Sequence, residues 1–442
     1  MKLELCNFQV NEALFGSTTR WRDGVLEISR DELHSLVVGD PLVESAEIDL
    51  ARPGESVRIA SNIDIIEPRV KVQGNGKVYP GVYRRDGSMV GSGRTHRLGG
   101  TSVIVMAPPP ASSTPGGGEG SGYGTGLAKS NSSISNELRA NFIDMCGPGA
   151  DTPYSELNNV CLIVRPVDGL DADEAMAVVQ SAQLRVSDYL AEATVDVVPP
   201  DVEVIDLTPK PGLPGYVWVN SILSPEAQNG NPHSPRGAAV YGVTRLTQPW
   251  FLSPTEVLDG AVYGNAGAGL FPTWPLTNTI VLEMCRRHGT EFNFLGCIMV
   301  RTMWEEQWQK ELMGEHAAFQ AVSVGADGAV ISPNARGQRM LDTVLIVQAF
   351  ERAGIKSVLI TEEEDNEEGN APPLLAVSPE IVAIVSSGTG SSFGPYPAVE
   401  RVIGNEDDLD SYLGELDPPH GRYGVSHLND VFGFSKITSF EY

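Results

Sequence analysis

The last third of the chain alternates apolar runs with amphipathic stretches, and this alternation limits its fold more than any other feature. Continuous apolar runs predict buried strands at residues 292–300, 328–332, 356–361 and 381–385. Helical spacing of apolar residues predicts helices over 303–322 and 341–353, and Gly354 ends the second of them. Strands and helices that alternate in this way predict a parallel sheet with helices on both faces, which is a doubly wound, Rossmann-like domain.

The carboxyl ends of parallel strands form the edge at which open α/β sheets bind their ligands. In this chain polar residues follow the expected strands, at Arg301-Thr302, Ser332-Pro333-Asn334, Thr361-Glu362 and Ser386-Ser387-Gly388. We therefore expect these residues to form the rim of any pocket in the last third of the chain.

The expected helix over 303–322 carries large apolar side chains at helical spacing. These side chains are Trp304, Trp308, Leu312 and Phe319. A row of this kind is most simply the face that a helix turns towards the core, and a stack on a cofactor is the alternative. We therefore predict that the row is buried.

The first half of the chain has short alternating segments and many turn residues. We expect a β-rich N-terminal part over 1–106, in which Ser29 caps a helix. Residues 107–136 are mostly Pro, Gly and Ser, and we predict a flexible insertion because they have little apolar surface to bury. Residues 137–245 are expected to continue the N-terminal domain as α/β structure, and residues 246–442 to form the C-terminal α/β domain.

Charge and cysteine content exclude several classes of function. The 57 acidic and 31 basic residues give a formal net charge of −26, and a surface this negative repels nucleic acids and anionic membranes. No apolar run approaches the ~20 residues needed to span a bilayer, and the first residues lack the pattern of a secretory signal. The five cysteines are scattered without a Cys-x-x-Cys pair, so we expect reduced thiols and a cytoplasmic location.

The stretch 252–269 is the central candidate site. Its polar residues Glu256 and Asp259 precede a Gly-rich loop, in which Asn265 is followed by Ala266. Glycines and alanines leave room for a ligand, and the polar residues beside them could line the space. The sequence therefore indicates a backbone-rich loop with carboxylates at its entrance.

Two other glycine turns carry candidate site residues. In the stretch 90–100 the glycines free backbone amides that could point at an anion, and Arg94 and His96 supply charge, although a tight β-turn is the simpler interpretation. Cys146 precedes a Gly-Pro-Gly turn, where a thiol is a nucleophile, a metal ligand or, more commonly, an inert buried side chain. Arg52 lies at a Pro-Gly turn, either in a solvated ion-pair cluster or in a site.

Six stretches resemble, in the same order, the component B proprotein subunits of the glycine, sarcosine and betaine reductase complexes. They are residues 49–59, 90–96, 144–151, 254–265, 325–332 and the tail 432–437. In that family a cysteine follows the Gly-Asn pair, and the chain cleaves itself there to leave a pyruvoyl group. This chain has Ala266 at that position, whose methyl group can neither attack a carbonyl nor eliminate. We therefore predict an unbroken chain without a pyruvoyl group.

The resemblance implies a subunit of a cytoplasmic two-component reductase complex. Its partner would be similar to the family's selenoprotein B and would carry a reactive Cys. The two chains would share an active site for a small amino or amide-type substrate, with a partner thiol or a bound metal in place of the pyruvoyl group. The alternative is a non-catalytic structural or regulatory subunit that stabilises the partner chain.

For the enzyme hypothesis the resemblance and the glycine turns together name the site residues. The catalytic candidates are Glu256, Asp259, Asn265 and Cys146. The substrate-binding candidates are Arg52, Arg94 and His96. The sequence assigns no cofactor and leaves a metal possible, and it does not identify the substrate or the redox partner.

Overall fold

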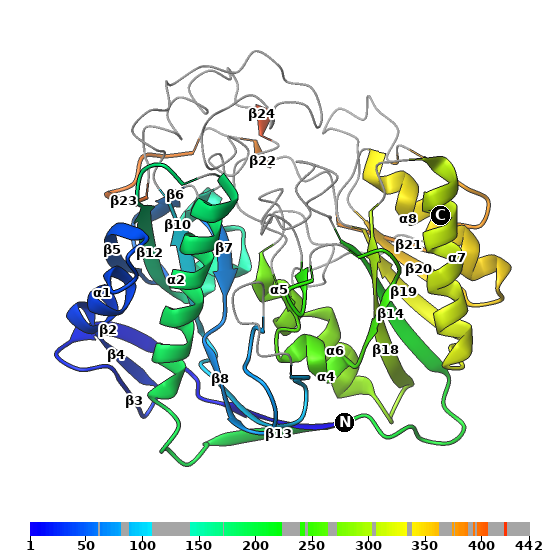
Figure 1. Cartoon of the computed structure of the whole chain (residues 1–442), viewed down its shortest axis with the longest axis horizontal. Helices are drawn as coiled ribbons and strands as arrows, with labels where there is room; N and C mark the ends of the chain where they lie inside the picture. The colour runs from blue at the N-terminus through cyan, green and yellow to red at the C-terminus, as the bar shows by residue number, and fades with distance from the viewer. Residues whose placement is uncertain are drawn as a thin grey trace.

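The chain is a mixed α/β protein with several sheets. The computed structural model describes residues 1–60, 62–80, 88–107, 142–170, 172–222, 239–243, 246–263, 272–302, 306–333, 338–361, 374, 376–387, 392–393, 396–404 and 420–421. The largest sheet has six strands and is mostly parallel, so the predicted α/β class is confirmed. Figure 1 shows this sheet on one side of the molecule and the N-terminal sheets on the other, with three short helices between them. These helices are α4 (Pro254–Leu258), α5 (Thr273–Asn278) and α6 (Ile280–Arg287).

The six-stranded sheet has the strand order β16-β18-β14-β19-β20-β21. In that order its strands are Trp250–Leu252, Asn293–Arg301, Gly215–Ile222, Gly328–Ser332, Lys356–Thr361 and Ile384–Ser386. The strands predicted at 328–332 and 356–361 coincide with β19 and β20. Strand β16 runs antiparallel to β18, whereas β14 pairs in parallel with both β18 and β19. The sheet thus takes β14 from residues that precede 246.

Two apolar layers cover the six-stranded sheet, because successive strand residues point to opposite faces. Val217, Val219 and Ile298 pack in one cluster with the helices α7 (Gln307–Ser323) and α8 (Gln338–Arg352). Trp218 and Met299 pack in another cluster with α4 and α6. Helices therefore lie on both sides of this sheet, as Figure 1 shows.

The apolar row predicted to be buried on the helix over 303–322 is exposed instead. Trp308 is 56% exposed and Phe319 is 68% exposed, and Trp304 lies outside the described residues. The buried face of α7 consists of smaller residues, namely Met313, Gly314, Ala317, Ala318 and Ala321. A β-carbon on Gly314 would lie 3.0 Å from the carbonyl oxygen of Leu345 in α8. The prediction was wrong because the close pair of helices needs small side chains at their contact.

The N-terminal half is built on a four-stranded sheet with the order β5-β12-β10-β7. These strands are Val43–Ala51, Asn158–Pro166, Thr101–Met106 and Asn62–Ile66. The helices α1 (Arg30–Val38) and α2 (Ala172–Glu192) pack with this sheet around one apolar core. Ser29 caps α1 as predicted, since its hydroxyl accepts a hydrogen bond from the Glu32 amide at 3.3 Å.

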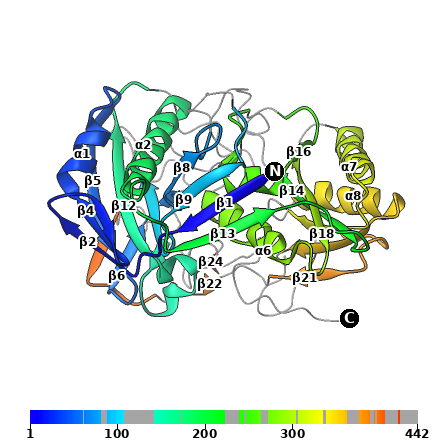
Figure 2. The ribbon, with the colours of Figure 1, turned by 90° about the horizontal axis from the view of Figure 1, so that it is seen from below.

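A second four-stranded sheet lies between the two halves, with the order β13-β1-β9-β8. Its strands are Asp201–Asp206, Lys2–Asn7, Gly93–Arg97 and Arg69–Gln73. Leu3 and Leu5 of β1 belong to the apolar cluster of the six-stranded sheet, whereas Cys6 belongs to the N-terminal core. Figure 2 shows these strands running across the molecule from below. The sheet therefore connects the two cores.

Smaller elements complete the described part of the chain. The three-stranded sheets are β2-β4-β3 (Glu12–Gly16, Val25–Ser29, Arg20–Arg22) and β11-β6-β23 (Phe142–Asp144, Val57–Ala60, Arg401–Ile403). There are also two short strand pairs, β15-β17 (Ala239–Val240, Val262–Tyr263) and β22-β24 (Ser392–Phe393, His420–Gly421). Two short 3₁₀ helices are η3 (Pro148–Ala150) and η4 (Pro153–Glu156). Apart from Ala107, the expected insertion at 107–136 lies outside the described residues. None of the described helices has the length and hydropathy to cross a bilayer.

Candidate functional site

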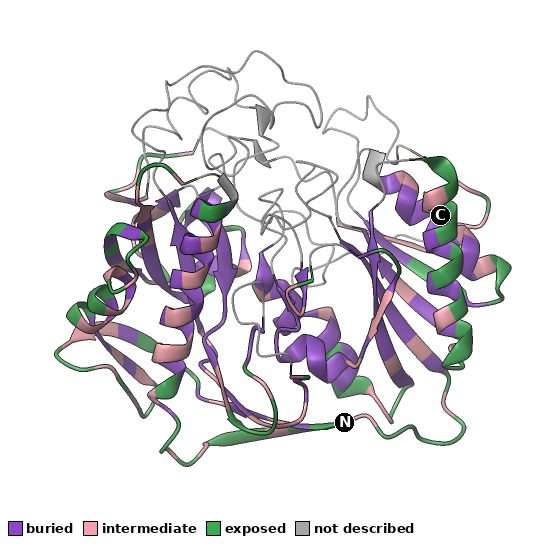
Figure 3. Ribbon diagram, viewed as in Figure 1, coloured by how far each residue is buried: buried purple, intermediate pink, exposed green. Residues whose placement is uncertain are grey.

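The segment that contains α4, α5 and α6 lies between the N-terminal sheets and the six-stranded sheet. Figure 3 shows that its residues are mostly buried, like the strands on either side of it. Helix α4 packs against β18 of the six-stranded sheet, and α5 packs against β7 of the N-terminal sheet. We call the contacts of β7, β8 and β9 with this segment the central junction. The predicted residues Glu256 and Asp259 both belong to it.

Glu256 holds the beginning of its own helix. Its carboxylate accepts hydrogen bonds from the Ser253 amide at 2.6 Å and from the Tyr241 hydroxyl at 2.7 Å. Ser253 and Glu256 form a capping box, which satisfies backbone donors that a helix start leaves free. Burial, together with the hydrogen bond to Glu256, raises the pKa of Tyr241 above its ordinary range. With 4% of its surface exposed, Glu256 is committed to these contacts.

Asp259 is fully buried and accepts hydrogen bonds from three donors of the N-terminal half. The Gly91 amide and the Thr95 hydroxyl each lie 2.7 Å from its carboxylate, and Lys71 forms an ion pair with it. Gly91 has a φ of 92°, and a β-carbon there would lie 2.7 Å from the Glu256 amide nitrogen. The Gly91 amide thus faces a carboxylate of the same chain.

Arg94 and His96 lie on the opposite face of β9 from Thr95, because side chains alternate along a strand. Arg94 forms an ion pair with Glu4 at 2.7 Å and is partly exposed. His96 is buried, and its Nδ1 lies 3.1 Å from the Thr194 hydroxyl. Burial lowers the pKa of His96, so the neutral ring is favoured. The structure thus places these two residues near each other but on the other side of the strand from Asp259.

Arg52 and Cys146 meet at a different place, where two turns touch. The Arg52 guanidinium donates to the Ala13 carbonyl at 2.7 Å and to Glu55 at 2.8 Å. In the same turn, the Gly54 amide donates to the carbonyl of Met145, the residue before Cys146, at 2.9 Å. The Cys146 thiol is half-buried, and all five cysteines are free. Asn265 and Ala266 lie outside the described residues.

Asp64 is a buried carboxylate that the sequence patterns did not identify. It accepts hydrogen bonds from the Thr273 amide at 2.9 Å and from the Thr273 hydroxyl at 3.1 Å. Burial raises its pKa to about 6, although hydrogen bonds from Thr273 and from the Ile65 amide work in the opposite direction. Tyr263 immediately precedes the stretch 264–271 and Thr273 follows it closely in the sequence. Asp64 therefore holds the chain just after this stretch, whereas just before it the Tyr263 hydroxyl donates to Gln183 at 3.2 Å.

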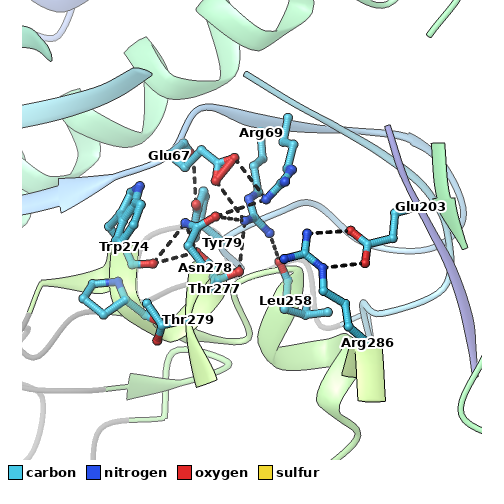
Figure 4. A network of polar contacts seen from close by, with 12 residues as sticks. Glu67, Arg69, Tyr79, Glu203, Leu258, Trp274, Thr277, Asn278, Thr279 and Arg286 are labelled. Carbon is cyan, nitrogen blue, oxygen red and sulfur yellow. Dashed lines mark hydrogen bonds and ion pairs between the residues drawn. The ribbon is translucent and has the colours of Figure 1, made fainter. Parts of the chain in front are cut away.

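Arg69 forms a second buried polar centre in the junction, shown in Figure 4. Its guanidinium donates to the carbonyl of Leu258, to the Thr277 carbonyl at 3.2 Å and to Glu67 at 3.1 Å. Asn278 accepts from Arg69 at 3.0 Å. In the same view, Arg286 and Glu203 form an outer ion pair at 2.8 Å. The helices α4 and α5 are thereby fixed to β8 by charged hydrogen bonds, which are roughly twice as strong as neutral ones.

The sequence contains one signal for these residues. Asp64, Glu67, Arg69 and Lys71 lie among the apolar residues Ile63, Ile65, Ile66 and Val70 in the stretch 62–71. Charged residues are almost never fully buried unless they are paired, so such a pattern indicates buried partners elsewhere in the chain. Among the described residues there is no cluster of three or more His, Cys, Asp and Glu side chains that could hold a metal ion.

The comparisons with known proteins identify the family to which the chain belongs. A family model described as glycine/sarcosine/betaine reductase component B subunits matches residues 1–426. The chain is 32% identical over 430 residues to the sarcosine reductase complex component B subunit alpha of Peptoclostridium acidaminophilum, covering 94% of this chain and 92% of the relative. No solved structure shows significant similarity to this chain.

Two further relatives cover the chain to a similar extent. The glycine reductase complex component B subunits alpha and beta of Acetoanaerobium sticklandii are 30% identical over 467 residues, which covers 100% of both chains. The betaine reductase complex component B subunit alpha of Peptoclostridium acidaminophilum is 31% identical over 426 residues, covering 92% of this chain and 89% of the relative. Since the family model and these relatives extend over almost the whole sequence, the chain belongs to the family of glycine/sarcosine/betaine reductase component B subunits.

Proposed function

We propose that this chain is a subunit of a cytoplasmic two-component reductase complex and shares an active site with a second chain. The match to component B subunits over residues 1–426 supports this proposal, as do relatives that are subunits of reductase complexes. In the proposal the second chain is similar to the family's selenoprotein B and carries a reactive Cys. The substrate is a small molecule with an amino or amide-type group.

The position of Asp64 is the observation that carries the catalytic part of the proposal. Its carboxylate is hydrogen-bonded to Thr273 at 2.9 Å, at one end of the stretch that contains Ala266. A group with a pKa of about 6 gains and loses a proton near physiological pH, which suits general acid–base catalysis. We assign Asp64 the exchange of a proton with the substrate nitrogen.

The residues present do not fit a pyruvoyl group made from this chain. A pyruvoyl group requires a nucleophilic side chain at the processing position, and Ala266 has none. In our proposal the chain stays whole, and a partner thiol or a bound metal provides the activating group. In the proposal such a metal would take ligands from both chains.

The sequence-predicted residues have two kinds of role in this proposal. Glu256 and Asp259 hold α4 and the Gly91 turn in place, because their carboxylates are engaged within the fold. Asn265 and Cys146 stay proposed catalytic groups. Arg52, Arg94 and His96 stay proposed substrate-binding residues. To bind the substrate, their side chains would have to leave their present hydrogen-bond partners.

The alternative function is a non-catalytic subunit that stabilises the partner chain. The hydrogen bonds and the ion pair that Asp259 receives from Gly91, Thr95 and Lys71 favour this alternative, since they join two distant segments of the fold. The two functions make different predictions for a variant without the Asp64 charge. The catalytic function predicts slower turnover, and the stabilising function predicts unchanged turnover.

The test compares the turnover of three purified complexes. They contain the wild-type chain, the Asp64→Asn variant or the control variant Asp144→Asn. Asp144 is also a buried carboxylate, but its charged partner is Arg58 and not a residue of α5. We expect Asp64→Asn to lower turnover of glycine, sarcosine or betaine by about 10²-fold or more and to remove a titration near pH 6. The control should retain the wild-type pH profile. An Asp64→Asn complex with the wild-type rate and profile would leave the stabilising subunit as the better function.

The prediction of an unbroken chain has a separate test. Intact mass spectrometry of the purified complex should give the mass of the whole chain. A fragment that begins near residue 266 and reacts with borohydride would contradict it.

A further inference from the structure

Helix α7 presents a row of large apolar side chains to solvent. Trp308, Leu312, Phe319 and Val322 are 56%, 38%, 68% and 49% exposed. Figure 3 shows the outer side of α7 exposed along its length, on the edge of the molecule opposite the N-terminal half. A contiguous exposed apolar surface of this kind marks an interaction site, whereas single exposed residues are ordinary. Val198, at 87% exposed, is an example of a single residue outside the row.

The spacing of the row is that of a helix-pairing surface. Residues 308, 312, 315, 319 and 322 follow one another at intervals of four and three, which is the heptad seam of a coiled coil. Glu315 takes the middle position and is exposed. The row runs for about four turns of helix, or ~20 Å, which is enough to receive a helix of similar length. The opposite face of α7 is already buried against α8 and the sheet.

A second copy of this chain is a poor occupant of the row. Because Glu315 is the central residue, pairing two α7 helices in register, either parallel or antiparallel, would place the two Glu315 carboxylates opposite each other. Like charges that face each other in an interface cost several kcal/mol. Each chain also has a net charge of −26, which adds long-range repulsion. Charge therefore favours a different chain with a cation at the centre of its contact surface.

We propose that the α7 row docks an amphipathic helix of another subunit, whose apolar seam carries a Lys or Arg opposite Glu315. Trp308 and Phe319 are the anchors, since aromatic side chains dominate the energetics of most interfaces. The inference rests on the proposed function only in that the chain works within a complex. It assigns the docking surface and the chemistry of the partner, and it does not involve Asp64 or the central loop.

The experiment places the photo-crosslinking residue p-benzoylphenylalanine at Leu312 of the full chain, expressed in the source cells. The native complex is purified, irradiated and digested, and the cross-linked partner peptide is sequenced by mass spectrometry. We expect a peptide of a different chain, with apolar residues at intervals of three and four and a Lys or Arg at the centre. A cross-link to a second copy of this chain, or to a peptide without that pattern, would overturn the inference.

Three variants measure the contribution of the row. Phe319→Asp and Glu315→Lys should each reduce the amount of co-purified partner at least tenfold, while Val198→Asp, which also adds a charge at an exposed apolar position, should leave it unchanged. Circular dichroism should show that all three fold, because the changed side chains are exposed or partly exposed. If every variant retains the partner, the docking surface is elsewhere and the proposed function stands. If the wild-type chain purifies alone, the proposed complex itself is contradicted.

Discussion

The six-stranded sheet and the central junction are both buried, but different forces hold them together. In the sheet, Val219, Ile298 and their neighbours pack against α7 and α8 through apolar contacts. In the junction, Arg69 and Asp259 are buried as charges and satisfied by hydrogen bonds from distant segments. Apolar packing tolerates side chains of similar size, whereas a buried charge needs its particular partner. We infer that the sheet provides most of the stability and the junction fixes how the two halves align.

The family-like stretches of the sequence also meet in pairs. The stretches 90–96 and 254–265 are joined by the hydrogen bond from the Gly91 amide to Asp259. The stretches 49–59 and 144–151 are joined by the ion pair of Arg58 with Asp144 at 2.6 Å. Motifs that resemble functional loops thus have a structural role as contacts between segments that are far apart in the chain.

Removal of Arg69 should cause the largest loss of stability. It is therefore the strongest test of the difference between the charged junction and the apolar sheet. Arg69→Met leaves Glu67 buried without its nearest cation and leaves the Leu258 and Thr277 carbonyls without that donor. We expect a loss of about 4–5 kcal/mol in the free energy of unfolding, measured by urea denaturation. The matched control is Arg286→Met. The Arg286 side chain is 46% exposed, so its ion pair with Glu203 should contribute about 1 kcal/mol or less to stability. Equal losses would remove the distinction between buried and exposed charge.

Asp259 and Lys71 provide the second test, through a double-mutant cycle. Asp259→Asn alone should cost about 3–4 kcal/mol, because it leaves the buried Lys71 ammonium without its counter-charge. Adding Lys71→Met should recover part of that loss, since no unpaired charge then remains. Urea denaturation of the two single variants and the double variant gives the coupling energy. Strictly additive losses would show that the pair is not coupled.

Asp64 predicts a pH dependence of stability that the apolar sheet cannot produce. Its folded-state pKa of about 6 lies above the ordinary value of 3.8, so its stabilising contribution is complete below pH 3.8 and is lost as the pH rises through 6. The difference corresponds to about 3 kcal/mol. Because part of this is already lost at pH 4, wild-type protein should lose about 2 kcal/mol of stability between pH 4 and pH 7 relative to Asp64→Asn. Unfolding curves at both pH values check this, and parallel pH profiles would contradict it.

A conservative change in the six-stranded sheet should have the smallest effect. Ile331→Val removes one buried methylene from β19, and we expect it to cost about 1 kcal/mol. The corresponding conservative change in the junction, Arg69→Lys, should cost more, because a lysine cannot reproduce the fork of donors that reaches Leu258, Thr277 and Glu67. Thermal unfolding of both variants compares them, and a smaller shift for Arg69→Lys would reverse our comparison.

The sequence predicted the regular parts of the fold because their signals are local. The strands β19 and β20 and the Ser29 cap follow from residues next to one another in the chain. The division of the chain into domains at 106, 136 and 245 stays a prediction. The α7 row was misassigned because the periodicity of a helix marks a shared face without saying whether that face is inside.

The candidate site was harder to predict because its contacts are not local. The glycine turn at 91–93 left open whether its amides face an anion, and the partner of the Gly91 amide, Asp259, lies 168 residues away. Likewise, nothing near Asp64 in the sequence indicates Thr273, which is 209 residues away. A charged residue in an apolar strand reveals that a partner exists, and only the folded chain shows which residue it is.

The anchoring of the central loop by Asp64 has an evolutionary consequence. Since Thr273 is fastened to that carboxylate and Tyr263 to Gln183, mutations between them need not disturb the surrounding architecture. A lineage could thus exchange a reactive residue at position 266 for alanine and keep its scaffold, and a protein engineer could graft new loop sequences between the same two anchors.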